Sequence, residues 1–226
     1  MRLILTFVIL VLPVVASAQD APVLKTDKDK LSYAMGMDLG AQLKSKSVDI
    51  DPSLFAAGLK DALAGRKTTL TAEEAKAAIS ELQRGLAVKQ AALAKAAGDK
   101  NKAEGDAFLS ANKAKAGVVT LPSGLQYKVL TAGTGRKPTS TDTVVCHYRG
   151  TLIDGKEFES SYKGEPVTFP IGQVIRGWAE VLQLMPVGSK WQVFVPSNLA
   201  YGERGTSAGI GPNATLIFEI ELIAIK

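Results

Sequence analysis

Aromatic side chains form the most informative pattern for chemistry in this sequence, because they recur in separate short segments of its C-terminal half. Six of them fall in six separate segments: Tyr148, Phe158, Phe169, Trp178, Tyr201 and Phe218. Brought together, they would form either a packed core or an apolar pocket that excludes water. Two features favour a pocket. Tyr148 and Tyr201 carry hydroxyls that need partners when buried, and Trp178 stands where a short helix begins, beside backbone N–H groups that the helix leaves free.

Covalent and metal-dependent mechanisms are disfavoured by the scarcity of the residues they need. The chain has one cysteine, Cys146, and one histidine, His147. Neighbours on a strand point to opposite faces, so these two side chains cannot form a dyad there. A single histidine cannot build a histidine-rich metal site, and a single cysteine cannot form an intrachain disulfide. We therefore expect no metal and no cofactor, with His147 a structural strand residue and Cys146 a packed thiol.

The N-terminus has the features of an export signal. Arg2 precedes an apolar run over residues 3–15, and Ala16, Ser17 and Ala18 then provide a small-x-small cleavage site. The run is shorter than the roughly 20 residues that a membrane-spanning helix needs. We expect residues 1–18 to be removed and the mature protein to lie in the periplasm, the outer membrane or the cell surface, without a transmembrane anchor. The net charge of +5 is scattered rather than clustered, so no nucleic-acid partner is expected.

Residues 19–116 have a helical composition. A first helix is expected from a cap at Asp27, and a second from Asp51-Pro52 to Gly65. Their apolar positions are Leu31, Met35, Leu39, Leu43, Leu54, Phe55, Leu59 and Leu63. Such a short segment cannot bury them alone, so residues 19–70 are interpreted as an all-α dimerisation domain that pairs two copies of the chain.

A long connecting helix is predicted over residues 71–116, because Thr71 and Glu74 form a capping box and no proline follows before Pro122. Residues 94–107 contain no large apolar side chain, which is typical of a solvated spacer between domains. Gly98 and Gly105 are expected to soften this stretch. A disordered linker is the alternative.

The pattern changes to strands after Pro122. Strands are expected at residues 125–131, 143–150, 167–170, 190–196 and 215–225, with a tight hairpin at Asp154-Gly155 and one short helix at 175–184. This predicts an α+β domain over residues 117–226, in which a twisted antiparallel sheet packs on that helix.

Five ordered motifs in this region resemble the signature segments of the FKBP-type peptidyl-prolyl isomerases. They are VCHYRG at 145–150, GKEFESS at 155–161, VIRGW at 174–178, LAYG at 199–202 and PNATLIF at 212–218. Upstream, GDAFLSANK at 105–113 and LPSGLQYK at 121–128 are similar to the macrophage infectivity potentiator group of that family. The resemblance covers nearly the whole mature chain.

The resemblance implies a shallow apolar pocket for a proline ring, with Trp178 as its floor. Its walls would be Tyr148, Phe158, Phe169, Val174, Ile175, Tyr201 and Phe218. The Ile175 backbone N–H and the Tyr201 hydroxyl would bind substrate carbonyls. Glu159 stands where the family more often has Asp, so its bond to Tyr148 and the binding of rapamycin or tacrolimus are expected to differ. The 203–211 flap also departs from the family pattern.

Rotation about an X–Pro bond needs no nucleophile, which suits the scarcity of reactive side chains. Its barrier is about 18–20 kcal/mol because amide resonance is lost in the twisted state. An apolar site favours the less polar twisted carbonyl. We thus expect an isomerase that assists proline-containing exported polypeptides to fold, as a V-shaped homodimer with chaperone activity. The alternatives are a holdase chaperone, or a surface-binding virulence factor, in which isomerase activity is incidental.

Overall fold

The computed structural model describes residues 22–207 and 209–226. The expected export signal at residues 1–18 lies outside the described residues. The described chain forms two compact units, and the division along the sequence falls between Ala75 and Lys76. Within the described part of the chain, no helix is both long enough and apolar enough to cross a bilayer.

The first unit contains two helices, α1 (Asp27–Ser45) and α2 (Pro52–Leu63). The cap of α1 is Thr26 rather than the expected Asp27, because the Thr26 hydroxyl accepts the N–H of Asp29 while the Asp29 carboxylate accepts the N–H of Thr26. This is a reciprocal capping box.

The apolar side chains of both helices face solvent in the single chain. Neither helix has a buried residue. Leu31 is 62% exposed, Leu54 73% and Leu63 80%. Helices with this much exposed apolar surface make no core of their own, as the sequence pattern indicated.

The long helix α3 (Ala72–Asn112) begins at the predicted capping box. The Thr71 hydroxyl accepts the Glu74 N–H at 3.2 Å, and a Glu74 carboxylate oxygen accepts the Thr71 N–H at 2.9 Å. From Lys76 onward the helix belongs to the second unit. The helical N-terminal region and the long helix of the predicted fold are thus both present.

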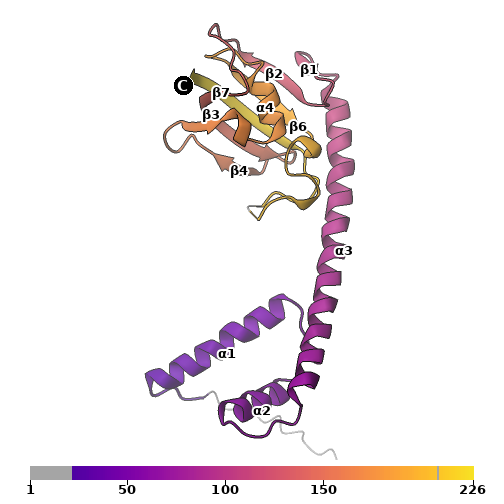
Figure 1. The fold of residues 1–226 in the computed structure, drawn as a ribbon, viewed down its shortest axis with the longest axis vertical. Coiled ribbons are helices and arrows are strands. Elements are labelled where there is room, and N and C mark those ends of the chain that lie inside the picture. Colours follow the sequence, from indigo (N-terminus) through magenta and orange to yellow (C-terminus); the bar gives the residue numbers. More distant parts are fainter. Residues whose placement is uncertain (1–21, 208) are drawn as a thin grey trace, which may run out of the picture. The chain divides into compact units, whose positions relative to one another are not determined.

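The second unit is built around one antiparallel sheet, seven-stranded within the described residues. Its strands are β1 (Val118–Thr120), β2 (Gln126–Thr131), β3 (Thr143–Leu152), β4 (Glu157–Ser160), β5 (Val167–Pro170), β6 (Lys190–Val195) and β7 (Leu216–Ile225). The order is β1-β2-β6-β7-β3-β4 (Figure 1). Strand β5 also pairs with β3. Sequence patterns missed the short strands β1 and β4, whereas the hairpin at Gly155 joins β3 to β4 as predicted.

Helix α4 (Arg176–Leu182) packs across this sheet and closes the core (Figure 1). Its approach is very close at Gly177, where an added Cβ would lie 2.5 Å from Val195 Cγ1. Short 3₁₀ helices precede α4 at Ile171–Gln173 and follow β6 at Ser197–Leu199 and Gly202–Arg204. The α+β prediction for this region is confirmed.

The C-terminal half of α3 packs on the sheet unit, so the predicted solvated spacer is wrong for one face of the helix. Gly98 and Gly105 are buried. A Cβ at Gly105 would lie 2.3 Å from Thr215 Oγ1, and one at Gly98 would lie 3.2 Å from Asn213 Nδ2. These glycines permit close approach rather than softening the helix, because the missing side chains leave room for the neighbouring loop.

Amide side chains secure the end of the same helix. Asn112, buried within the second unit, donates from Nδ2 to Gln126 Oε1 at 2.9 Å, and Gln126 Nε2 donates to the Leu109 carbonyl at 2.9 Å. Phe108 packs on Phe194 with ring centroids 5.9 Å apart. Since buried amides without partners would be costly, these matched pairs keep α3 attached at one position and register.

We expect Gly105→Ala to destabilise the second unit although alanine is the better helix former. Overpacking typically costs about 1–3 kcal/mol, which outweighs the roughly 1 kcal/mol that alanine adds to a helix. Urea denaturation followed by tryptophan fluorescence measures this, because Trp178 and Trp191 both lie in the second unit. Gly85→Ala is the matched control, since nothing lies within 4 Å of a Cβ there. An unchanged midpoint for Gly105→Ala would contradict the close packing.

Candidate active site

A cavity of about 280 Å³ opens beside α4 and contains most of the predicted site residues. It is lined by Tyr148, Glu159, Phe169, Gln173, Val174, Ile175, Trp178, Tyr201 and Phe218. Eight of the nine predicted residues therefore meet at one cavity. Gln173 was missed, and its position beside Val174 was the only signal that could have indicated it.

Trp178 is the central ring of this cavity and is only 4% exposed. Three aromatic rings meet it nearly edge-on: Tyr148 at 5.2 Å, Phe169 at 5.5 Å and Phe218 at 5.3 Å between centroids. Perpendicular contacts of this kind are favoured by the ring quadrupoles. The indole Nε1–H is buried and has no acceptor among the described residues.

Phe158 is the predicted site residue that does not line the cavity. Its ring lies edge-on to Phe218, with centroids 5.7 Å apart and an angle of 88° between planes. Gly150 makes this arrangement possible, since a Cβ there would lie 2.5 Å from the Phe158 ring and 3.0 Å from the Phe218 ring. Phe158 thus packs on Phe218, which lines the cavity.

The cavity walls come from elements far apart in the chain. Tyr148 lies on β3, Phe169 on β5 and Phe218 on β7. Val174 and Ile175 occupy the two positions before α4, where the helix leaves backbone N–H groups without internal partners. Tyr201 follows the 3₁₀ helix at Ser197–Leu199 and is 38% exposed, so it forms part of the rim.

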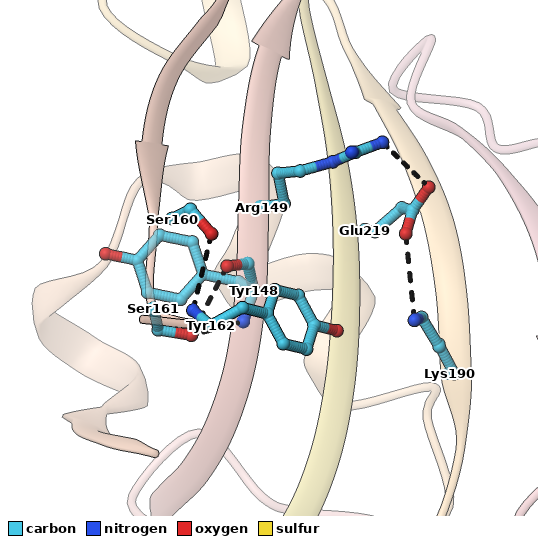
Figure 2. A network of polar contacts seen from close by, with 7 residues as sticks. All are labelled: Tyr148, Arg149, Ser160, Ser161, Tyr162, Lys190 and Glu219. Atoms are coloured by element: carbon cyan, nitrogen blue, oxygen red, sulfur yellow. Dashed lines mark hydrogen bonds and ion pairs between the residues drawn. The ribbon is translucent and has the colours of Figure 1, made fainter. Parts of the chain in front are cut away.

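Ser161 fixes the backbone that positions Tyr148 (Figure 2). The Ser161 hydroxyl accepts the Tyr148 N–H at 2.8 Å, and the Ser161 N–H donates to the Tyr148 carbonyl at 2.9 Å. Nearby on the sheet, Glu219 forms ion pairs with Arg149 at 3.4 Å and with Lys190 at 3.7 Å (Figure 2). Such partly exposed pairs add little stability, whereas the two bonds of Ser161 hold the backbone at Tyr148 directly.

The two tyrosine hydroxyls at the cavity keep their protons to a higher pH than an ordinary tyrosine does, because their pKa values are raised. Burial raises the pKa of Tyr148, and its hydrogen bond to the Glu159 carboxylate raises that pKa further. Burial also raises the pKa of Tyr201, with a smaller contribution from the Glu159 charge. The Glu159 carboxylate thus raises the pKa of Tyr148 even though this acid is one methylene longer than the expected Asp.

His147 and Cys146 lie apart from this chemistry. His147 Nδ1 lies 3.0 Å from Ser161 Oγ, and its ring stacks on Tyr162 at 5.0 Å. Cys146 is fully buried, and desolvation raises its pKa to about 12. Their predicted structural roles agree with these positions. Among the described residues, no three His, Cys, Asp or Glu side chains are grouped to hold a metal ion.

Two family models match the chain. Residues 134–223 match the FKBP-type peptidyl-prolyl cis-trans isomerase model, and residues 28–129 match the domain amino terminal to FKBP-type peptidyl-prolyl isomerase. The peptidyl-prolyl cis-trans isomerase Mip of Coxiella burnetii is 45% identical over the whole chain and 98% of its own length. This chain belongs to the FKBP-type peptidyl-prolyl cis-trans isomerase family.

Two further comparisons support the same family. The outer membrane protein MIP of Legionella longbeachae is 54% identical over 93% of this chain and 91% of that protein. The crystal structure of FkpA from Escherichia coli superposes with a TM-score of 0.69 at 35% identity, over 90% of this chain and 99% of FkpA. The predicted resemblance, fold class and isomerase activity are therefore confirmed for this FKBP-type enzyme.

The isomerase should show a flat pH profile across the neutral and mildly alkaline range. An ordinary tyrosine loses its proton near pH 10, and the raised pKa values of Tyr148 and Tyr201 move that loss still higher. We expect kcat/KM for a Leu-Pro tetrapeptide to change less than about twofold between about pH 7 and 9. NMR exchange measurements give this without a coupled protease. An inflection in that interval would indicate a catalytic group that titrates there.

Proposed function

We propose that the Trp178 cavity binds the proline ring of an X–Pro segment and accelerates rotation of its amide by removing it from water. The observation that supports this most directly is the set of three rings packed edge-on around Trp178. A rigid apolar surface can hold the ring while the carbonyl turns. Because the twisted amide is less polar than the planar one, it loses less on leaving water, and the barrier falls.

Two polar groups at the rim complete the proposal. The backbone N–H of Ile175, at the start of α4, and the hydroxyl of Tyr201 would donate to substrate carbonyls and hold the twisted conformer. Glu159 would keep the Tyr148 hydroxyl oriented through their hydrogen bond. These assignments need no proton transfer, which suits a site whose tyrosine hydroxyls stay protonated.

We extend the proposal to rapamycin and tacrolimus as ligands of the same cavity, bound less tightly than by relatives that have Asp at the Glu159 position. The longer side chain shifts the carboxylate relative to Tyr148, and so changes the polar edge that a drug would meet. The test is to measure the rapamycin inhibition constant for the isomerase activity of the wild type and of the Glu159→Asp variant. Equal inhibition constants would dismiss the role of Glu159.

Tyr201→Phe removes one hydroxyl while keeping the ring at the rim. A net hydrogen bond contributes about 0.5–1.5 kcal/mol, so we expect kcat/KM to fall roughly 2- to 12-fold with the thermal midpoint unchanged. Tyr162→Phe is the matched control, because Tyr162 stacks on His147 outside the cavity. Full activity in Tyr201→Phe would remove this hydroxyl from the mechanism.

We also propose that the protein acts on exported polypeptides as a homodimer formed by α1 and α2. Support comes from the exposed apolar faces of these helices and from the similarity to a relative named as an outer membrane protein. Uncatalysed proline isomerisation takes tens to hundreds of seconds, so a folding chain outside the cytoplasm would benefit from catalysis. Two catalytic units in one dimer would let a client bind at two points and gain avidity.

Light scattering on the chain from residue 19 should give about twice the mass of one chain. Replacing Leu54 by Asp should shift the mass toward a monomer, because its side chain is 73% exposed in the single chain and an acid there opposes apolar pairing. Lys67→Asp is a charge-changing control in the same unit, outside α2. A monomeric wild type at micromolar concentration would rule out the dimer.

A holdase chaperone or surface-binding factor is the second candidate, favoured by the same exposed apolar helices. The two candidates are separated by measuring how well the Tyr201→Phe variant suppresses aggregation of an unfolded client protein, compared with the wild type. Chaperoning that is undiminished when isomerisation is reduced would favour the holdase. A parallel loss of both would favour the isomerase.

A further inference from the structure

The loop over residues 202–213 leaves the cavity directly after Tyr201 and returns towards β7. Its two ends are joined by a hydrogen bond from the Asn213 N–H to the Gly202 carbonyl, 2.8 Å long. Within it, the Thr206 N–H donates to the Ile210 carbonyl at 2.8 Å, and Ile210 is 5% exposed. The hydrogen bond from Asn213 to Gly202 therefore ties the backbone next to Tyr201 to the far end of this loop.

Helix α3 holds that far end. Asn101 Nδ2 donates to the Pro212 carbonyl at 2.8 Å, across 111 positions of sequence. The same nitrogen would lie 3.0 Å from a Cβ added at Gly211, and Pro212 Cβ would lie 3.3 Å from one added at Gly98. One face of α3 is thus fitted closely to the end of the loop.

The bond from Asn101 matters because it acts on the one backbone polar group that Pro212 has. Proline has no N–H, so its carbonyl is the only backbone polar group available to fix it. The next residue, Asn213, adopts a left-handed conformation with φ of 54°, which is uncommon outside glycine. Asn213 also makes the bond that closes the loop, so fixing Pro212 fixes the donor to Gly202.

We propose that Asn101 is a positioning residue for catalysis, which holds Pro212 and thereby sets Tyr201 at the rim of the cavity. The connection runs from Asn101 to the Pro212 carbonyl, through Asn213 to Gly202, and so to its neighbour Tyr201. The inference rests on the proposed role of the Tyr201 hydroxyl. It makes the long helix part of the active-site architecture as well as a connection between units.

A double-mutant cycle tests this connection in the full-length mature chain. Asn101→Asp keeps the shape of the side chain but replaces the N–H donor by an oxygen that the Pro212 carbonyl repels. We expect kcat/KM for a Leu-Pro tetrapeptide to fall up to about tenfold, as for the loss of one hydrogen bond. In a Tyr201→Phe background the same change should cost less than about twofold, because interacting sites are not additive.

Two matched variants separate positioning from general damage. Asn101→Gln retains an amide donor and should recover part of the activity. Lys100→Ala changes the neighbouring residue, whose only ion pair is with Glu104 at 3.9 Å on the described chain, and should leave kcat/KM unchanged. The thermal midpoint of each variant is recorded in parallel. If Asn101→Asp does not fold, Gly98→Ala tests the same connection, because its new Cβ would press on Pro212 and Asn213 and displace the end of the loop.

The outcomes are distinct. A loss in Asn101→Asp that disappears in the Tyr201→Phe background supports the proposal. An unchanged kcat/KM, a fully additive loss or an equal loss in Lys100→Ala overturns it. If Tyr201→Phe alone is fully active, the proposed role of Tyr201 fails, whereas an active Asn101→Asp beside an impaired Tyr201→Phe refutes only the inference about Asn101.

Discussion

The perpendicular packing of aromatic rings around Trp178 is the constraint on which the rest of the isomerase unit depends. Three rings meet the indole at 77–87°, so the strands that carry them cannot shift without losing these contacts. Gly150 and Gly177 have no side chain because ring atoms or β6 occupy that space. Tyr148, Trp178 and Phe218 line the cavity and also belong to the buried core, so these walls are rigid. Rigidity of this kind is what the proposed preference for one amide geometry needs.

The stretch of helix α3 before Phe108 shows how a helix can dock without large apolar side chains. Between Ala94 and Ala107 it has none, yet its glycine face fits against the loop before β7. Dispersion contacts between backbone and loop replace the usual interdigitation of large side chains. Asn101 and Asn112 add direction to this contact because their amide groups have specific partners. Close approach thus achieves what a hydrophobic stripe does in most amphipathic helices.

The helical N-terminal region presents the opposite case. Its apolar positions are evident from sequence spacing, and in the single chain they remain on the surface. Large exposed apolar surfaces usually mark interaction sites. In the single chain this region therefore leaves apolar surface in contact with water, whereas the isomerase unit encloses its own core. This contrast supports the proposals that the first region pairs with a second polypeptide and that the second region binds a short segment.

The amino-acid sequence by itself determined the helix starts at Asp51 and Thr71, the main strands, the hairpin at Gly155 and eight residues of the cavity. These follow from local chemistry: caps, alternation, turn residues and recognisable short motifs. Only the tertiary structure decided that Phe158 packs on Phe218, that Gln173 lines the cavity, and that Gly98 and Gly105 face a neighbouring loop. Those outcomes depend on which distant atoms occupy the space beside a residue, and a polar stretch of helix or a lone glycine has no local signal of its neighbours.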